Sequence, residues 1–135
     1  MTAAENLAIF KRFLRELGRG NYDVINEVCS PEFVFRSPNF PGWPRGFEGA
    51  RRIAQAGSTL IGNAEHTIDD LFATEDRVVM RMTIRGTFVG EPTPGFPAKG
   101  EKFAMGAVAI YRMIDGKIVD DWGIQLTSPT DAPWG

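Results

Sequence analysis

Apolar residues recur at spacings of three and four near the start of the chain. One stripe of them predicts a helix over 4–17, formed by Leu7, Phe10, Phe13, Leu14 and Leu17. Gly18 and Gly20 end this pattern. A second, short helix is predicted around Val24, Ile25 and Val28, with Asn21 as its cap and Ser30-Pro31 as its stop. A third helix is predicted over 47–60.

Strand patterns follow the helices. One strand is predicted over 32–37, before a loop rich in proline and glycine over 38–46. Four more are predicted over 65–74, 77–90, 101–113 and 117–126, with tight turns at Asp76 and Asp115-Gly116. Gly86, inside a long strand, indicates a bulge or bend. Helices followed by adjacent strands favour an α+β fold, with the helices on one face of a curved antiparallel sheet.

Composition narrows the functional classes. The 135 residues fit one domain over 1–135, and 43% are hydrophobic and 24% charged. A net charge of −2 argues against a nucleic-acid or membrane partner. A single cysteine, Cys29, and a single histidine, His66, argue against a disulfide framework and a multi-histidine metal site. We therefore expect no metal and no cofactor. The lack of a signal-peptide layout or a long apolar run predicts a cytoplasmic protein.

Three segments carry a family resemblance: FLRELGRGNYDVINEVCSPEFVFRSP, TIDDLFATEDRVVMRMTIRGTFVGE and IYRMIDGKIVDDW. Their order and spacing resemble the SnoaL-like polyketide cyclase family, within the nuclear transport factor two-like superfamily. The resemblance implies a cystatin-like α+β barrel, whose three helices and concave sheet form a cone-shaped pocket for a small apolar molecule. The same fold hosts cyclases, isomerases, dehydratases, hydrolases and binding proteins.

The catalytic positions that the resemblance implies are changed in this chain. Aldol cyclases of the family carry a carboxylate four residues after the last-strand tryptophan, and four residues after Trp122 stands Leu126. The ketosteroid isomerases, distant relatives, have an acid where this chain has Ser37 and a tyrosine where it has Phe13. Limonene-epoxide hydrolase, another relative, has an arginine at the position of Arg81, but its acids are missing here.

Other groups could take over the chemistry. His66 titrates near neutrality when unperturbed, which suits an acid or base, although a surface role fits it as well. Asp70 shares a strand with His66, and Asp69 and Asp121 are further carboxylates, of which Asp121 is expected to face away from Trp122. Arg81 is a candidate for holding an oxyanion, or belongs to an external row of charges. The candidate catalytic residues are therefore His66, Arg81 and Asp70.

Ligand contacts are predicted for Phe13, Ser37, Trp43, Tyr111, Trp122 and Leu126, which core packing would also explain. The loop over 90–100 is either a lid or a stiff connection. Three hypotheses follow: a cofactor-free enzyme acting on an apolar carbonyl compound, a non-catalytic ligand-binding domain, and an interaction module. In each of them we expect a homodimer through the open sheet face.

Overall fold

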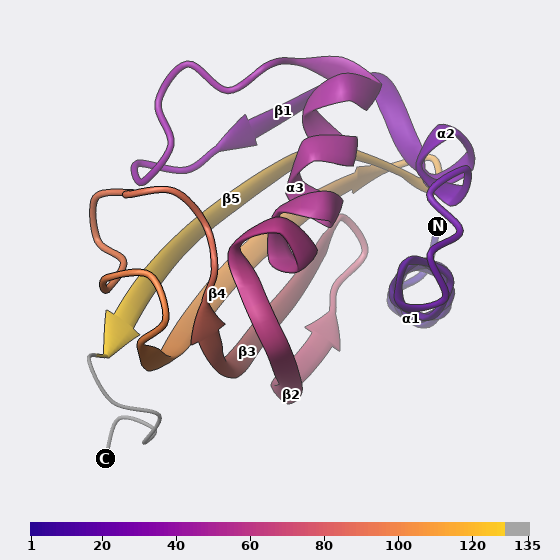
Figure 1. The fold of residues 1–135 in the computed structure, drawn as a ribbon. Helices are drawn as coiled ribbons and strands as arrows, with labels where there is room; N and C mark the ends of the chain where they lie inside the picture. The colour runs from indigo at the N-terminus through magenta and orange to yellow at the C-terminus, as the bar shows by residue number, and fades with distance from the viewer. Residues whose placement is uncertain (129–135) are drawn as a thin grey trace.

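A computed structural model describes residues 1–128, apart from the side chains of residues 57, 58 and 128. Figure 1 shows a curved sheet with helices on one of its faces. The elements in chain order are α1 (Ala3–Gly18), α2 (Val24–Val28), β1 (Cys29–Arg36), α3 (Gly46–Leu60), β2 (Ile61–Ala73), β3 (Arg77–Phe88), β4 (Lys102–Ile114) and β5 (Lys117–Ser128).

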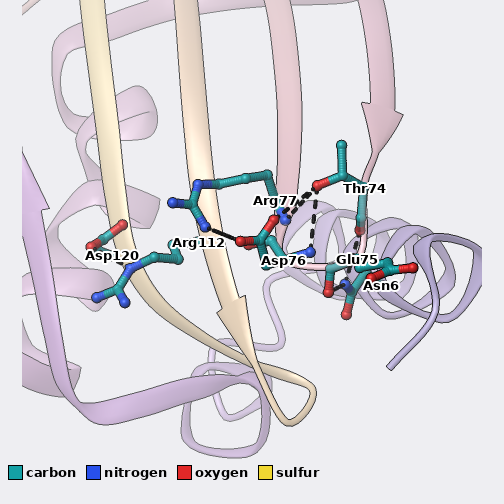
Figure 2. Close-up of polar contacts among 7 residues, drawn as sticks. All are labelled: Asn6, Thr74, Glu75, Asp76, Arg77, Arg112 and Asp120. Carbon is teal, nitrogen blue, oxygen red and sulfur yellow. Dashed lines mark hydrogen bonds and ion pairs between the residues drawn. The ribbon is translucent and has the colours of Figure 1, made fainter.

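Local sequence explains where α1 begins. The Thr2 hydroxyl accepts a hydrogen bond from the Glu5 backbone N–H, and the Glu5 carboxylate accepts one from the Thr2 N–H, which together form a capping box. The helix buries Phe10 and Phe13 against the sheet, as the apolar stripe predicts. Asn6 is also buried, and its Nδ2 donates to the carbonyls of Thr74 and Glu75 in the β2–β3 turn (Figure 2). These bonds fix α1 at one end of the sheet.

The strand order is β1-β5-β4-β3-β2. Strands β2 to β5 pair antiparallel, as predicted, whereas β1 pairs parallel with β5. The parallel pair arises because α3 carries the chain from β1 to the opposite edge, and three hairpins return it. β1 also begins earlier than predicted, at Cys29, and includes Pro31. A proline is tolerated there because β1 is an edge strand.

Helix α3 creates the cone. It lies over one face of the curved sheet, where its contacts are chiefly with the two edge strands, β1 and β2 (Figure 1). The inner sheet face packs on the helices through Val78, Met80, Tyr111 and Met113. The resulting cone confirms the predicted fold class.

Two irregularities in β2 change which side chains face inward. Its pairing with β3 shifts between Gly62 and Glu65 and again between Ile68 and Asp70. The first shift lies beside Gly86, where an added Cβ would stand 2.8 Å from the Gly62 carbonyl oxygen. The irregularity predicted at Gly86 is therefore a bulge in the neighbouring strand. At the second shift the extra residue is Asp69.

The loop over 90–100 is attached to a second core cluster. The ring of Phe96 stacks on Phe88 at 5.2 Å between centroids and meets Phe103 edge-on at 5.7 Å. The Thr127 hydroxyl also donates a hydrogen bond to the Gly95 carbonyl. These contacts favour the stiff connection over the lid.

Candidate functional site

One carboxylate stands inside the cone. Asp121 lies on β5, opposite Phe35 of β1 and Tyr111 of β4, and its side chain points to the inner face. The residue is only 4% exposed. Its Oδ1 is buried and accepts no hydrogen bond from any residue that the structure describes. A buried carboxylate oxygen without a donor is unfavourable when ionised.

This environment moves the titration of Asp121 into the neutral range. Burial first, and then the charge of Asp120, raise the pKa of Asp121 from 3.8 to about 7. The negative charge acts on its neighbours in turn. Burial and then Asp121 raise the pKa of Tyr111 well above its ordinary value, and they raise the pKa of Cys29 to about 12. A carboxyl group that titrates near pH 7 can both take and return a proton under physiological conditions.

The adjacent residue provides a contrast within the same strand. Asp120 points to the outer face, where its Oδ2 accepts a hydrogen bond of 3.1 Å from Arg112 Nε (Figure 2). Arg36 Nε lies 3.6 Å from the same oxygen. Asp120 is therefore neutralised by two cations, while Asp121 on the other side of the strand has none as a bonded partner among the described residues.

The sheet in front of Asp121 carries small side chains. Gly123 follows Asp121 on the inner face and pairs with Ala109, and the next inner residue, Gln125, pairs with Ala107. A Cβ added at Gly123 would lie 3.5 Å from Asp121 Oδ1 and 3.6 Å from the Ala109 Cβ. The Cβ position of Gly123 therefore adjoins the carboxylate, and Gly123 is buried like Asp121.

Comparison with known proteins identifies the family. The model of the SnoaL-like polyketide cyclases matches residues 8–125. The chain belongs to this family. Its fold is similar to TsrD from Streptomyces laurentii, with a TM-score of 0.72, 30% identity and coverage of 93% of this chain and 90% of that one. No curated protein sequence matches the chain.

Two further solved structures are similar to the chain. IdmH from Streptomyces antibioticus, a candidate polyketide cyclase, gives a TM-score of 0.68 and 26% identity over 89% of this chain and 91% of that one. A candidate SnoaL-like polyketide cyclase from Jannaschia gives a TM-score of 0.76 over 92% of this chain and 87% of that one. At 20% identity this second likeness concerns the fold alone.

Tyr111 lies beside Asp121, and Phe13 is connected to Tyr111 through the ring of Phe10. The Phe10 ring contacts both, with centroid distances of 4.6 Å to Tyr111 and 6.0 Å to Phe13. Tyr111 is the direct cross-strand neighbour of Asp121. Phe13 is 8% exposed and belongs to the main core cluster, so packing accounts for it.

Ser37 and Trp43 support the β1 side of the cone. Ser37 is buried, and its Oγ accepts a hydrogen bond of 3.2 Å from the Asn39 N–H. Trp43 meets the Phe35 ring at 5.3 Å between centroids and donates through Nε1 to the Gly49 carbonyl at 2.9 Å. Phe35 is the residue opposite Asp121, so Trp43 stands one ring away from the carboxylate.

Two of the three predicted catalytic residues, Asp70 and Arg81, come together, but on the outer face of the sheet and apart from His66. The bulge at Asp69 turns Asp70 to the outer face, where its Oδ2 accepts a hydrogen bond of 2.7 Å from Arg81 Nε. Arg81 is therefore exposed and ion-paired outside the cone. This position fits the alternative that Arg81 belongs to an external row of charges. His66 lies opposite Ile84 on the inner side, but on an edge strand and exposed.

Trp122 and Leu126 face away from the cone. They are 46% and 64% exposed and share the outer face with Val108, Ile110 and Ile124. A hollow of about 300 Å³ opens on that face beside Arg81, Thr83, Gly106 and Leu126. Along β5 the apolar side chains therefore face outward, and the small and polar side chains face inward. This is the reverse of the expected arrangement, in which Trp122 and Leu126 contact the ligand.

From sequence, Asp121 was one of several possible carboxylates, expected to face away from Trp122, and it was not among the three candidate catalytic residues. The sequence feature that could have indicated Asp121 is the alternation along this strand, in which Asp121, Gly123 and Gln125 share one face and the apolar residues share the other. Among residues 1–128, no cluster of three or more metal-ligating side chains is found. None of the described helices is long and apolar enough to cross a membrane.

Proposed function

We propose that this protein is a cofactor-free enzyme that transfers a proton at the carbon beside the carbonyl group of an apolar small molecule, with Asp121 as the proton-transfer group. The observation that carries the proposal is the buried Asp121 Oδ1, which faces the cone and accepts no hydrogen bond from the described residues. Cyclisation, isomerisation and dehydration of carbonyl compounds can all begin with such a transfer. The family membership supports a small-molecule reaction.

The first step follows from the two groups that face each other across β4 and β5. Ionised Asp121 takes the proton as the C–H bond breaks, and the electron pair moves to the carbonyl oxygen to give an enolate. The pKa of Tyr111 is raised by burial, so its hydroxyl stays protonated and can donate a hydrogen bond to that oxygen. Asp121 then returns its proton to carbon or to oxygen. Its pKa near neutrality suits both directions.

The test measures proton exchange directly. The protein is incubated with 2-tetralone in D2O, and exchange of the protons beside the carbonyl is followed by NMR. We expect Asp121→Asn to lower the rate by roughly 100-fold or more, the range for loss of a general base. Asp120→Asn is the matched control, because it removes the neighbouring carboxylate on the outer face. It should keep the plateau rate and move the pH midpoint downward, since the Asp120 charge raises the pKa of Asp121.

Other outcomes separate the alternatives. Full exchange by Asp121→Asn would refute the role of Asp121. Binding of 2-tetralone by the wild type without any exchange would favour the non-catalytic ligand-binding domain. Loss of exchange in His66→Ala, with full exchange in Asp121→Asn, would move the proton transfer to the rim of the cone.

We also propose that the outer sheet face pairs with a second copy of the chain. Five large apolar side chains on this face, Val108, Ile110, Trp122, Ile124 and Leu126, are 38% to 64% exposed. At about 150–250 Å² for a large side chain, they leave roughly 400 Å² of apolar surface uncovered. Such a patch is large enough to form the centre of a standard interface.

The dimer is tested by mass from light scattering after size-exclusion chromatography. Ile124→Glu should yield monomers, whereas Val89→Glu should not, although both side chains are 40% exposed. A monomeric wild type would contradict the dimer. A cytoplasmic location and the lack of nucleic-acid partners stay predictions.

A further inference from the structure

The outer face of β4 and β5 carries a column of four cross-strand pairs. In order along the two strands, the pairs are Gly106 with Leu126, Val108 with Ile124, Ile110 with Trp122, and Arg112 with Asp120. The column lies on the face of the sheet opposite the helices (Figure 1). It therefore occupies the centre of the surface that we propose to pair two copies of the chain.

The first pair of the column combines the most protruding side chain with an empty position. Leu126 is 64% exposed, more than any other large apolar side chain that the structure describes. Gly106 beside it has no side chain, and the hollow of about 300 Å³ opens over it, bordered also by Thr83 and Val108. Gly106 lies inside β4 without a positive φ angle, so its backbone conformation does not require glycine. What the glycine provides is the space above it.

Two-fold symmetry acts on this column in a simple way. When two identical sheets pack face to face, the axis that exchanges them lies in the plane between the sheets. An axis that runs along β4 and β5, midway between the two strands, places each residue of β4 over its β5 partner in the other copy. Each cross-strand pair of one copy then faces the same pair of the other, with its two members exchanged.

We propose that two copies pair in this register, with Leu126 of each copy seated in the hollow over Gly106 of the other. The next two pairs of the column then bring large, exposed apolar side chains together. The last pair places Arg112 of one copy over Asp120 of the other, where opposite charges attract. This inference rests on the proposed dimer and deepens it, since it states which residues meet.

An axis across the strands would not match these features. Through the centre of the apolar side chains, it would turn the column end to end, so that Trp122 lies over Leu126 of the other copy. Arg112 would then lie over Ala104, which carries no charge. The fit of a large side chain into the hollow and the pairing of charges therefore both favour the axis along the strands.

The register is tested by exchanging the leucine and the glycine. Gly106→Leu fills the hollow and Leu126→Gly removes its occupant, so each should raise the dissociation constant of the dimer by roughly 10-fold or more. The double variant moves both features to the opposite strand, where the same axis pairs them again. It should dimerise within about 3-fold of the wild type, measured by sedimentation equilibrium.

Gly18→Leu is the matched control for the added side chain. Gly18 is exposed at the end of α1, and a Cβ there meets nothing within 4 Å. This variant should dimerise as the wild type does. A wild-type circular dichroism spectrum and a single thermal transition establish that each variant is folded before its dissociation constant is compared.

A cysteine placed away from the centre of the column distinguishes the two axes. With the axis along the strands, the two thiols of Ile110→Cys face each other across stacked sheets about 10 Å apart. With the axis across the strands, they lie a further four residues, about 13 Å, apart along the strands. We expect a short bismaleimide to link Ile110→Cys into covalent dimers. Ile124→Cys, at the centre, is the control that should be linked with either axis, and the native Cys29 is buried.

Three results would overturn the register and leave the dimer in place. They are an unchanged dissociation constant in Gly106→Leu, a folded double variant that does not recover dimerisation, and linkage of Ile124→Cys without linkage of Ile110→Cys. The first of these would also assign the hollow to an occupant other than the second copy. A monomeric wild type would remove the dimer together with its register, and none of these results bears on proton transfer at Asp121.

Discussion

Removing the Asp121 carboxyl group should abolish a loss of stability that the wild type undergoes as pH rises into the neutral range. The folded state holds the pKa of this group at about 7, against an ordinary value of 3.8. Between these values the folded protein binds more protons than the unfolded chain, so the stability of the wild type falls as pH rises. Its contribution is fully favourable below the lower value and is lost as pH passes the higher one.

The size of the effect follows from the shift. Each pH unit between the two pKa values lowers the free energy of unfolding by about 1.4 kcal/mol, so the wild type loses roughly 3 kcal/mol between pH 5 and pH 8 through this group. Asp121→Asn cannot ionise and keeps a nearly constant stability in this range. A buried asparagine amide adds a cost of its own, but that cost does not depend on pH, so the slope isolates the carboxyl group.

Urea unfolding at pH 5, 6, 7 and 8 measures this slope. The difference in unfolding free energy between Asp121→Asn and the wild type should grow by roughly 3 kcal/mol in favour of the variant. Asp120→Asn should retain a slope that levels off at a lower pH, because Asp121 keeps its burial but no longer feels the Asp120 charge. Parallel curves for Asp121→Asn and the wild type would refute the raised pKa, and with it the chemical role given to this residue.

The remaining predictions concern the frame around the site. Asn6→Ala removes two hydrogen bonds to the β2–β3 turn and should lower the unfolding free energy by roughly 2 kcal/mol, measured in urea. Cys29 is buried and the pKa of its thiol is raised to about 12, so a thiol reagent at pH 8 should react with it only at the rate of opening or unfolding. Gly86→Ala places a Cβ 2.4 Å from Ile61 Cγ2 and should lower the melting temperature through about 1–3 kcal/mol of overpacking.

The elements were predictable because their signals are local. The apolar stripe around Phe10 and Phe13 marks α1, and Asp115-Gly116 marks the β4–β5 turn, where both residues adopt positive φ angles of 49° and 76°. The parallel pairing of β1 was missed, since it depends on which edge α3 leads to and no local pattern encodes that choice.

The site was harder to predict, because alternation along a strand does not reveal which face is inside. The row of Trp122 and Leu126 is the more apolar, and simple burial favours it for the interior. The curved sheet instead encloses Asp121 and Gly123, and it leaves the apolar row on the open face. On β2 the bulge at Asp69 reverses the order in which side chains alternate between the two faces. Asp70 therefore lies on the outer face, whereas His66 lies on the inner one.

The parallel pairing of β1 with β5 has a consequence for biosynthesis. Phe35 is paired with Asp121 across these strands, and the two lie far apart in the sequence. A ribosome must therefore release most of the sequence before these two residues can pair, and a nascent chain that lacks β5 has no site at all. Pairings between such distant segments form late and slowly during folding. Proton-transfer activity is thus expected to appear with the slowest folding phase.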